Sequence, residues 1–202
     1  MTASREIRLK SRPVGVPTHA DFELATVEVA APGEGEVQVK NLWMSVDPYM
    51  RGRMNDAKSY ADPFMLGEPM TGGAVGTVTE SNNADFPVGA KVLHMAGWRD
   101  SAVFGGDKTP PAGMPPVKLP DLGVPDQHWL SIIGMPGGTA WFGLLKVAEA
   151  KAGEVIFVSA AAGAVGSTVT QIAKAKGMKV IALTGASGGK LKPLAEIGRA
   201  HV

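Results

Sequence analysis

Polar and apolar residues alternate along the first half of the chain in short stretches that turn residues interrupt. Glu36–Leu42 has a period close to two, which is typical of a strand with one face buried. Further strands are predicted at Ala74–Thr79, Lys91–Leu93 and Ser101–Phe104, and a short apolar step lies at Val117–Leu119. Glycine and proline separate these stretches, so the first half predicts a compact β-barrel or sandwich-like domain.

The pattern changes near residue 122, beyond which apolar residues recur at helical spacing. Two such segments are Asp126–Ile133 and Thr139–Ala150. We therefore expect a first domain over residues 1–122 and a second over residues 123–202.

The second domain contains a strand, a glycine-rich turn, a helix and another strand in succession. Val155–Ser159 and Lys179–Leu183 are apolar runs, typical of parallel strands buried on both faces. Between them, helical spacing predicts a helix that ends at Gly177. This order is the beginning of an α/β fold, a doubly wound parallel sheet of the Rossmann type.

The turn in this unit has the composition of a phosphate-binding turn. It reads Ala-x-Gly-x-x-Gly, with Ala161 where the usual pattern has its first glycine. A helix N-terminus offers free N–H groups and the positive end of its dipole to an anion, and glycine lets the anion approach. We predict contacts with a dinucleotide pyrophosphate from Ala161, Gly163, Ala164, Val165 and Gly166. The alternative is a flavodoxin-like or other βαβ unit whose turn is purely structural.

The residues about 20 positions further on favour NADP(H) over NAD. Cofactor domains for NAD usually carry a carboxylate there, which binds the ribose hydroxyls. The segment Thr184–Lys190 has no carboxylate, and it offers Ser187 and Lys190 to a 2′-phosphate. A solvated surface lysine is the alternative interpretation of Lys190.

Composition excludes several classes of function. The 202 residues have a formal net charge of +1, so charge gives no reason to expect a nucleic acid or an anionic membrane as a partner. We find no signal-peptide core and no stretch near the roughly 18 apolar residues of a membrane span. The chain has no cysteine, which excludes disulfides and fits a cytoplasmic protein.

Zinc chemistry is also disfavoured. Zinc sites use cysteine, histidine and carboxylate ligands at short, regular spacings. The four histidines are scattered through the sequence without such spacing: His19, His94, His128 and His201. We therefore predict that no metal is bound.

Two longer motifs resemble one branch of the medium-chain dehydrogenase/reductases. They are Met44–Met54, which contains Asp-Pro-Tyr-Met-Arg-Gly-Arg-Met, and Gly134–Leu145, which contains Gly-Met-Pro-Gly-Gly-Thr-Ala-Trp. Both are similar to motifs of the zinc-independent leukotriene B4 dehydrogenase, prostaglandin reductase and alkenal reductase branch, and Ser59-Tyr60 matches its curcumin-reductase-like members. The resemblance implies a GroES-like β-barrel domain followed by a Rossmann domain, with the active site in the cleft between them.

The resemblance also implies site residues and a reaction. Tyr49 and Tyr60 would line the substrate side, and we expect Pro136 and Thr139 to contact the cofactor. The expected substrate is a small α,β-unsaturated ketone or aldehyde, whose C=C bond accepts a hydride from NADPH while a tyrosine hydroxyl stabilises the enolate. A structural alternative for Tyr49 is a ring that packs beside Pro48 as an anchor.

Other functions and an incomplete chain have to be considered as well. A quinone oxidoreductase, an enoyl thioester reductase or a non-enzymatic nucleotide-binding protein could use the same scaffold. Only two parallel strands follow Val155, whereas a doubly wound domain has about six. We expect a truncated and inactive fragment of a homodimeric parent, since Ile197–Val202 also matches the translation of a common sequencing adapter. A native stop codon after Val202 would refute the truncation.

Overall fold

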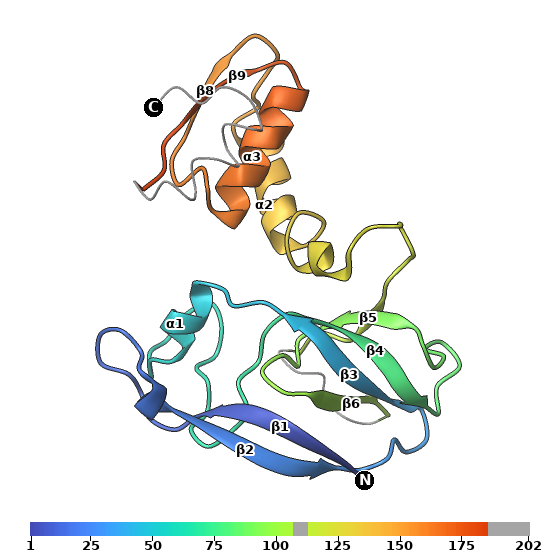
Figure 1. Cartoon of the computed structure of the whole chain (residues 1–202). Coiled ribbons are helices and arrows are strands. Elements are labelled where there is room, and N and C mark those ends of the chain that lie inside the picture. The colour runs from blue at the N-terminus through green and yellow to red at the C-terminus, as the bar shows by residue number, and fades with distance from the viewer. Residues whose placement is uncertain (107–112, 186–202) are drawn as a thin grey trace. The chain divides into compact units, whose positions relative to one another are not determined.

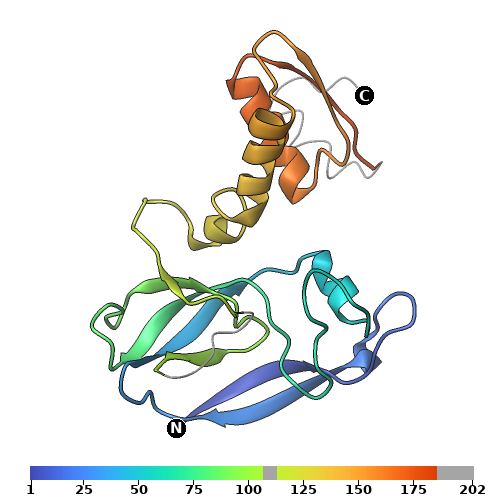
Figure 2. The same cartoon turned by 180° about the vertical axis from the view of Figure 1, so that it is seen from behind.

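The computed structural model describes residues 1–106 and 113–185, and their contacts form two compact units. Unit 1 is Met1–Gln127 and unit 2 is His128–Val202. Both units can be followed by colour in Figure 1 and from behind in Figure 2. The domain limits expected from the sequence, 1–122 and 123–202, stay a prediction.

Unit 1 is built on a five-stranded antiparallel sheet with the order β6-β3-β4-β5-β7. Its strands are β3 (Glu36–Met44), β4 (Ala74–Ser81), β5 (Lys91–His94), β6 (Ser101–Gly105) and β7 (Val117–Lys118). Strands β3 to β6 fall where the sequence predicts strands, whereas β7 lies in the segment that the sequence marks only as a short apolar step. The main core lies on this sheet and is made of Val37, Val39, Val78, Val92, Ala96, Ala102 and Phe104.

The N-terminal end of β3 is buried more completely than its sequence suggests. Glu36–Val39 are all buried, although alternation predicts one open face. That expectation is wrong here, in part because the preceding turn folds onto the strand. The Glu36 carboxylate accepts a hydrogen bond from the Gly33 N–H at 2.9 Å.

The other strands among the described residues of unit 1 form an antiparallel pair, β1 (Thr2–Leu9) with β2 (Phe22–Val29). The sequence pattern does not locate either strand. Two inward side chains of β1 are polar, because Ser4 and Glu6 are buried. The Glu6 carboxylate accepts a 2.7 Å hydrogen bond from Arg8 Nε, so its charge is compensated.

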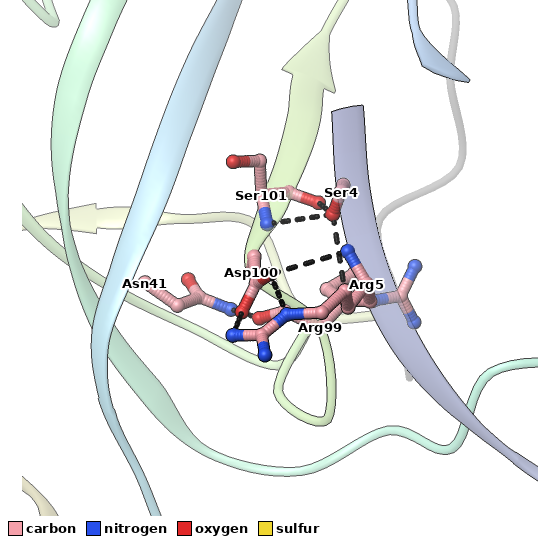
Figure 3. A network of polar contacts seen from close by, with 6 residues as sticks. All are labelled: Ser4, Arg5, Asn41, Arg99, Asp100 and Ser101. Atoms are coloured by element: carbon pink, nitrogen blue, oxygen red, sulfur yellow. Dashed lines mark hydrogen bonds and ion pairs between the residues drawn. The ribbon is translucent and has the colours of Figure 1, made fainter. Parts of the chain in front are cut away.

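Polar contacts join β1 to the first residue of β6 and to the residue before it (Figure 3). The Ser101 N–H donates to Ser4 Oγ at 3.0 Å, and Arg5 Nε lies 2.8 Å from Asp100 Oδ2. From β3, the side-chain amide of Asn41 donates to the Arg99 carbonyl oxygen at 2.8 Å. Residues almost a hundred positions apart are thus held together by hydrogen bonds.

A short helix and a second core cluster complete the part of unit 1 that matters for the site. Helix α1 spans Tyr49–Arg53, and a 3-10 turn, η1, spans His19–Asp21. Met50, on the buried side of α1, packs in a cluster with Leu9, Met54, Phe64 and Met70. Tyr49 and Trp98 pack against the same cluster, so α1 is fixed by apolar contacts on one side.

In its described residues, up to position 185, unit 2 has helices first and then a parallel pair of strands on either side of a helix. The elements are the 3-10 helix η3 (Asp126–Leu130, its first two residues still in unit 1), α2 (Met135–Phe142), the π-helix η4 (Gly143–Val147), β8 (Val155–Val158), α3 (Ala164–Ala175) and β9 (Lys179–Ala182). Strands β8 and β9 pair in parallel, as the sequence predicts. Helices α2 and α3 pack side by side (Figure 2).

Two expectations for unit 2 need correction. The first helical segment is only a 3-10 helix, and α2 starts at Met135 rather than Thr139. The strands are not buried on both faces, because Phe157 is 63% exposed whereas Val158 is 6% exposed. Alternate side chains of β8 and β9 pack toward α3, and the described residues place no layer over the other face.

Candidate cofactor and substrate site

The turn between β8 and α3 is tightly folded. Ala160 has a φ of 50°, in the left-handed region that side chains disfavour. The Gly163 N–H donates to the Ala160 carbonyl oxygen at 2.8 Å, and the Ala161 N–H donates to Leu183 O at 2.9 Å. Ala161 itself is completely buried and its N–H is already engaged, so its part in the turn is packing.

The first turn of α3 presents exposed main chain directly after this bend. Gly163 is the N-cap and bears no side chain that could cap the helix. Because the Ser167 N–H donates to Gly163 O (2.9 Å), the N–H groups of Ala164, Val165 and Gly166 precede the first intrahelical bond. No acidic residue lies in this turn, and Gly163, Ala164 and Val165 are exposed. These features fit an anion such as a pyrophosphate.

Gly166 has a packing role that the sequence motif predicts. A Cβ at this position would collide with the Ala160 carbonyl oxygen and lie 2.9 Å from Ala161 Cα. Only glycine therefore lets the helix approach the turn this closely. The five turn residues predicted from the sequence come together in one bend, while Ser187 and Lys190 lie outside the described residues.

Pro136 and Thr139 both lie in α2, whose first turn is unusually close to the preceding chain. A Cβ at Gly137 would collide with the Ile132 carbonyl group. The Thr139 hydroxyl donates to Met135 O at 2.8 Å, so its proton is already engaged within the helix. Its oxygen stays exposed and could still accept a hydrogen bond.

Tyr49 is the first residue of α1 and is only partly exposed. Two residues earlier, Asp47 accepts a hydrogen bond from the Ser45 hydroxyl at 2.6 Å. Burial raises the pKa of Tyr49 above its ordinary value, and the negative charge of Asp47 raises it further. The Tyr49 hydroxyl therefore keeps its proton at neutral pH and can act as a hydrogen-bond donor.

Tyr60 differs from Tyr49 because its side chain is almost fully exposed, at 86%. It lies in the segment that leads from α1 to the buried Phe64. The Phe64 N–H donates to Arg53 O at 2.7 Å, which fixes the end of this segment against α1. Tyr49 thus lies in α1, and the segment that carries Tyr60 is hydrogen-bonded to the end of the same helix.

Arg51 and Arg53 lie on the same helix, and both donate to main-chain carbonyl oxygens. Arg51 Nη2 lies 2.8 Å from Gly15 O, and Arg53 Nε lies 2.7 Å from Asp62 O. The influence of Arg53 on Tyr49 was missed, although its hydrogen bond and its charge both lower the pKa of that hydroxyl. A spacing of four residues on a helix is the signal that could have found it.

Other polar groups of the described residues do not form a metal site. Within residues 1–106 and 113–185, no three histidine or carboxylate side chains lie close enough to hold a metal ion. His94 is buried in unit 1, where its ring lies 4.6 Å from the Phe104 ring and Nδ1 accepts from the Ala96 N–H at 3.1 Å. In the same residues, no helix has the length and apolar character needed to cross a membrane.

Comparisons with known proteins agree with the two motifs. Residues 5–111 match the family model described as the N-terminal domain of oxidoreductase. The chain is 44% identical over 179 residues to NADPH-dependent curcumin reductase of Escherichia coli (strain K12), covering 89% of this chain and 50% of that protein. It is 43% identical to prostaglandin reductase 1 of Bos taurus, with coverage of 88% and 50%. It is 39% identical to a 2-alkenal reductase (NADP(+)-dependent) of Nicotiana tabacum, with coverage of 94% and 54%.

The fold is shared with a solved relative as well. The structure of CurA from Vibrio vulnificus in complex with NADPH superposes with a TM-score of 0.81 at 43% identity, covering 91% of this chain and 52% of CurA. The chain thus spans about half the length of the relatives it matches. Unit 1 has the predicted GroES-like fold, and unit 2 contains the first parallel strands of a Rossmann sheet. The chain belongs to the prostaglandin reductase, curcumin reductase and alkenal reductase branch of the medium-chain dehydrogenase/reductases.

Proposed function

We propose that the protein, with the C-terminal half that its relatives have, is an NADPH-dependent reductase of the C=C bond in α,β-unsaturated ketones and aldehydes. The observation that carries the proposal is the exposed first turn of α3, where small residues follow a strand directly. Relatives at 39–44% identity are named as NADPH-dependent curcumin reductase, prostaglandin reductase and 2-alkenal reductase, which supports the choice of reaction.

The residues of this chain would bind and polarise, while the cofactor carries the reducing equivalent. The N–H groups of Ala164–Gly166 would hold the pyrophosphate, and the sequence predicts that Ser187 and Lys190 bind the 2′-phosphate. NADPH, when bound, supplies the hydride that adds to the β-carbon of the substrate.

On the substrate side, the proton of Tyr49 is the feature that matters. Negative charge develops on the carbonyl oxygen as the hydride adds, and a hydroxyl with a raised pKa donates a hydrogen bond to it. Tyr60, which is exposed, is a second donor for the same oxygen. The α-carbon then takes a proton from a tyrosine or from solvent. We further propose a cytoplasmic enzyme and a homodimer, both on the family resemblance.

The proposal is tested on a full-length version cloned through the native stop codon. NADPH affinity is measured by titration, and NADPH oxidation is followed with an alkenal, a diarylheptanoid enone and a quinone. We expect turnover of the alkenal and the enone, and a loss of about 10²–10³ in rate for Tyr49→Phe. Activity with the quinone alone would favour a quinone oxidoreductase, and failure to bind NADPH would reject the proposal.

A further inference from the structure

The guanidinium of Arg53 contacts three different residues. Its Nε lies 2.7 Å from Asp62 O and its Nη1 lies 3.0 Å from Thr71 Oγ1. The centre of the guanidinium lies 4.2 Å above the centroid of the Phe64 ring. Such a planar fork makes several directional contacts at once, which a lysine ammonium cannot reproduce.

One turn earlier on the same helix lies Tyr49, and Arg53 acts on its hydroxyl. Burial and Asp47 raise the pKa of Tyr49, whereas the charge and the hydrogen bond of Arg53 lower it. The Tyr49 ring packs against the cluster that contains Met50 and Phe64. The ring is therefore fixed by packing against the cluster that contains Phe64, and the Arg53 guanidinium lies over that same Phe64 ring.

The same guanidinium also holds the segment that carries Tyr60. Asp62 lies two residues after Tyr60, and its carbonyl oxygen accepts from Arg53 Nε. Close by, the Arg53 carbonyl oxygen accepts a hydrogen bond from the Phe64 N–H at 2.7 Å. The side chain of Arg53 thus anchors the segment that carries the exposed Tyr60 to α1.

We propose that Arg53 is a positioning residue that holds the Tyr49 hydroxyl and the Tyr60 segment in one fixed arrangement for the carbonyl oxygen of the substrate. This inference rests on the proposed function, because only a reaction that develops charge on that oxygen needs two oriented hydroxyls. Arg51 provides a matched control. It lies on the same helix, but it binds the chain at Pro13 and Gly15 instead.

The first test measures the titration of the tyrosine hydroxyls and needs no enzyme activity. It is simple to interpret because the chain contains only two tyrosines. With tyrosine labelled by ¹³C at Cζ, the titration of each hydroxyl is followed by NMR, and Tyr60→Phe assigns the two signals. We expect Arg53→Gln to raise the titration midpoint of Tyr49, Arg53→Lys to raise it less, and Arg51→Gln to leave it in place. An unchanged midpoint in folded Arg53→Gln would overturn the inference.

Hydrogen exchange provides the second readout in the same three variants. Amides of residues 60–64 should exchange faster in Arg53→Gln, while Arg51→Gln should affect residues 13–15 instead. Equal exchange over residues 60–64 in both variants would contradict a specific hold by Arg53. Arg53→Lys keeps the positive charge and serves if Arg53→Gln does not fold.

The third readout uses the full-length enzyme. Arg53→Gln should lower kcat by about 10–100-fold with a smaller change in KM, because misplaced donors weaken binding of the transition state more than of the substrate. Arg51→Gln should stay within a few-fold of the parent. A normal kcat for Arg53→Gln would reject the positioning role. An inactive parent would reject the proposed function instead, and the tyrosine titration would still decide the contact.

Discussion

Unit 1 and unit 2 differ in how completely their strands are covered. Val39 in β3 is fully buried, whereas Val155 in β8 is 60% exposed. Both valines lie in strands that the sequence predicts. An apolar pattern therefore specifies that a strand forms, but the layers that pack on it decide how much of the strand is buried.

Acid should affect unit 1 most strongly, because it contains a buried neutral histidine. Burial, and to a lesser extent the charge of Arg99, lowers the pKa of His94 from 6.5 to about 4. The unfolded chain takes up this proton near pH 6.5, while the folded chain resists it down to about pH 4. The free energy of unfolding should therefore decrease as the pH is lowered from 6.5 to about 4, by up to roughly 3 kcal/mol. Urea unfolding at a series of pH values measures it.

His94→Gln is the control for this acid sensitivity, because glutamine does not titrate. Its unfolding free energy should change little between pH 6.5 and 4. Asp100, whose pKa is held below its ordinary value of 3.8 by Arg5, contributes to acid loss only at lower pH. A parent protein with a flat profile across the window would show that His94 is not buried in its neutral form.

The same substitution in the two units should give unequal losses. Val39→Ala removes buried methyl groups and should lower the free energy of unfolding by about 2 kcal/mol. Val155→Ala removes exposed ones and should cost less than about 0.5 kcal/mol. Chemical unfolding monitored by tryptophan fluorescence compares them. Similar losses for both valines would mean that another layer covers β8 in solution.

Within unit 2, two glycines should respond in opposite directions. Gly166→Ala should destabilise the turn by about 1.5 kcal/mol, because its Cβ would collide with the Ala160 carbonyl oxygen. Gly138→Ala in α2 meets no atom within 4 Å and should stabilise by up to about 1 kcal/mol. Thermal unfolding measures both. Two changes of the same sign would argue against the close approach of α3 to the turn.

The sequence predicts those parts of the fold whose signals are local. Strands β3 to β6 and the βαβ unit follow from alternation, apolar runs and turn residues, whereas β7 coincides with a short apolar step. Strand β1 does not, because its inward positions include Ser4 and Glu6, whose polarity is compensated by contacts that a pattern cannot show. Ser4 finds its partner in Ser101, far along the chain.

The candidate site shows the same limit. The glycines at 163 and 166 are recognisable because a helix N-terminus and a tight turn demand them. The start of α2 is less recognisable, since its first turn contains proline and two glycines that look like a loop. Position 137 requires glycine because the helix approaches the Ile132 carbonyl group too closely for a side chain. The contacts of Arg53 with Asp62 and Thr71 depend on a loop that no local pattern describes.

The left-handed backbone of Ala160 has a consequence for recognition at the α3 turn. An alanine samples this region less readily than a glycine, so its conformation depends on the neighbouring hydrogen bonds of Ala161 and Gly163. Once those bonds form, the loop has one shape, and an incoming anion does not have to order it. A rigid receptor of this kind loses little entropy on binding, which favours affinity from only a few main-chain contacts.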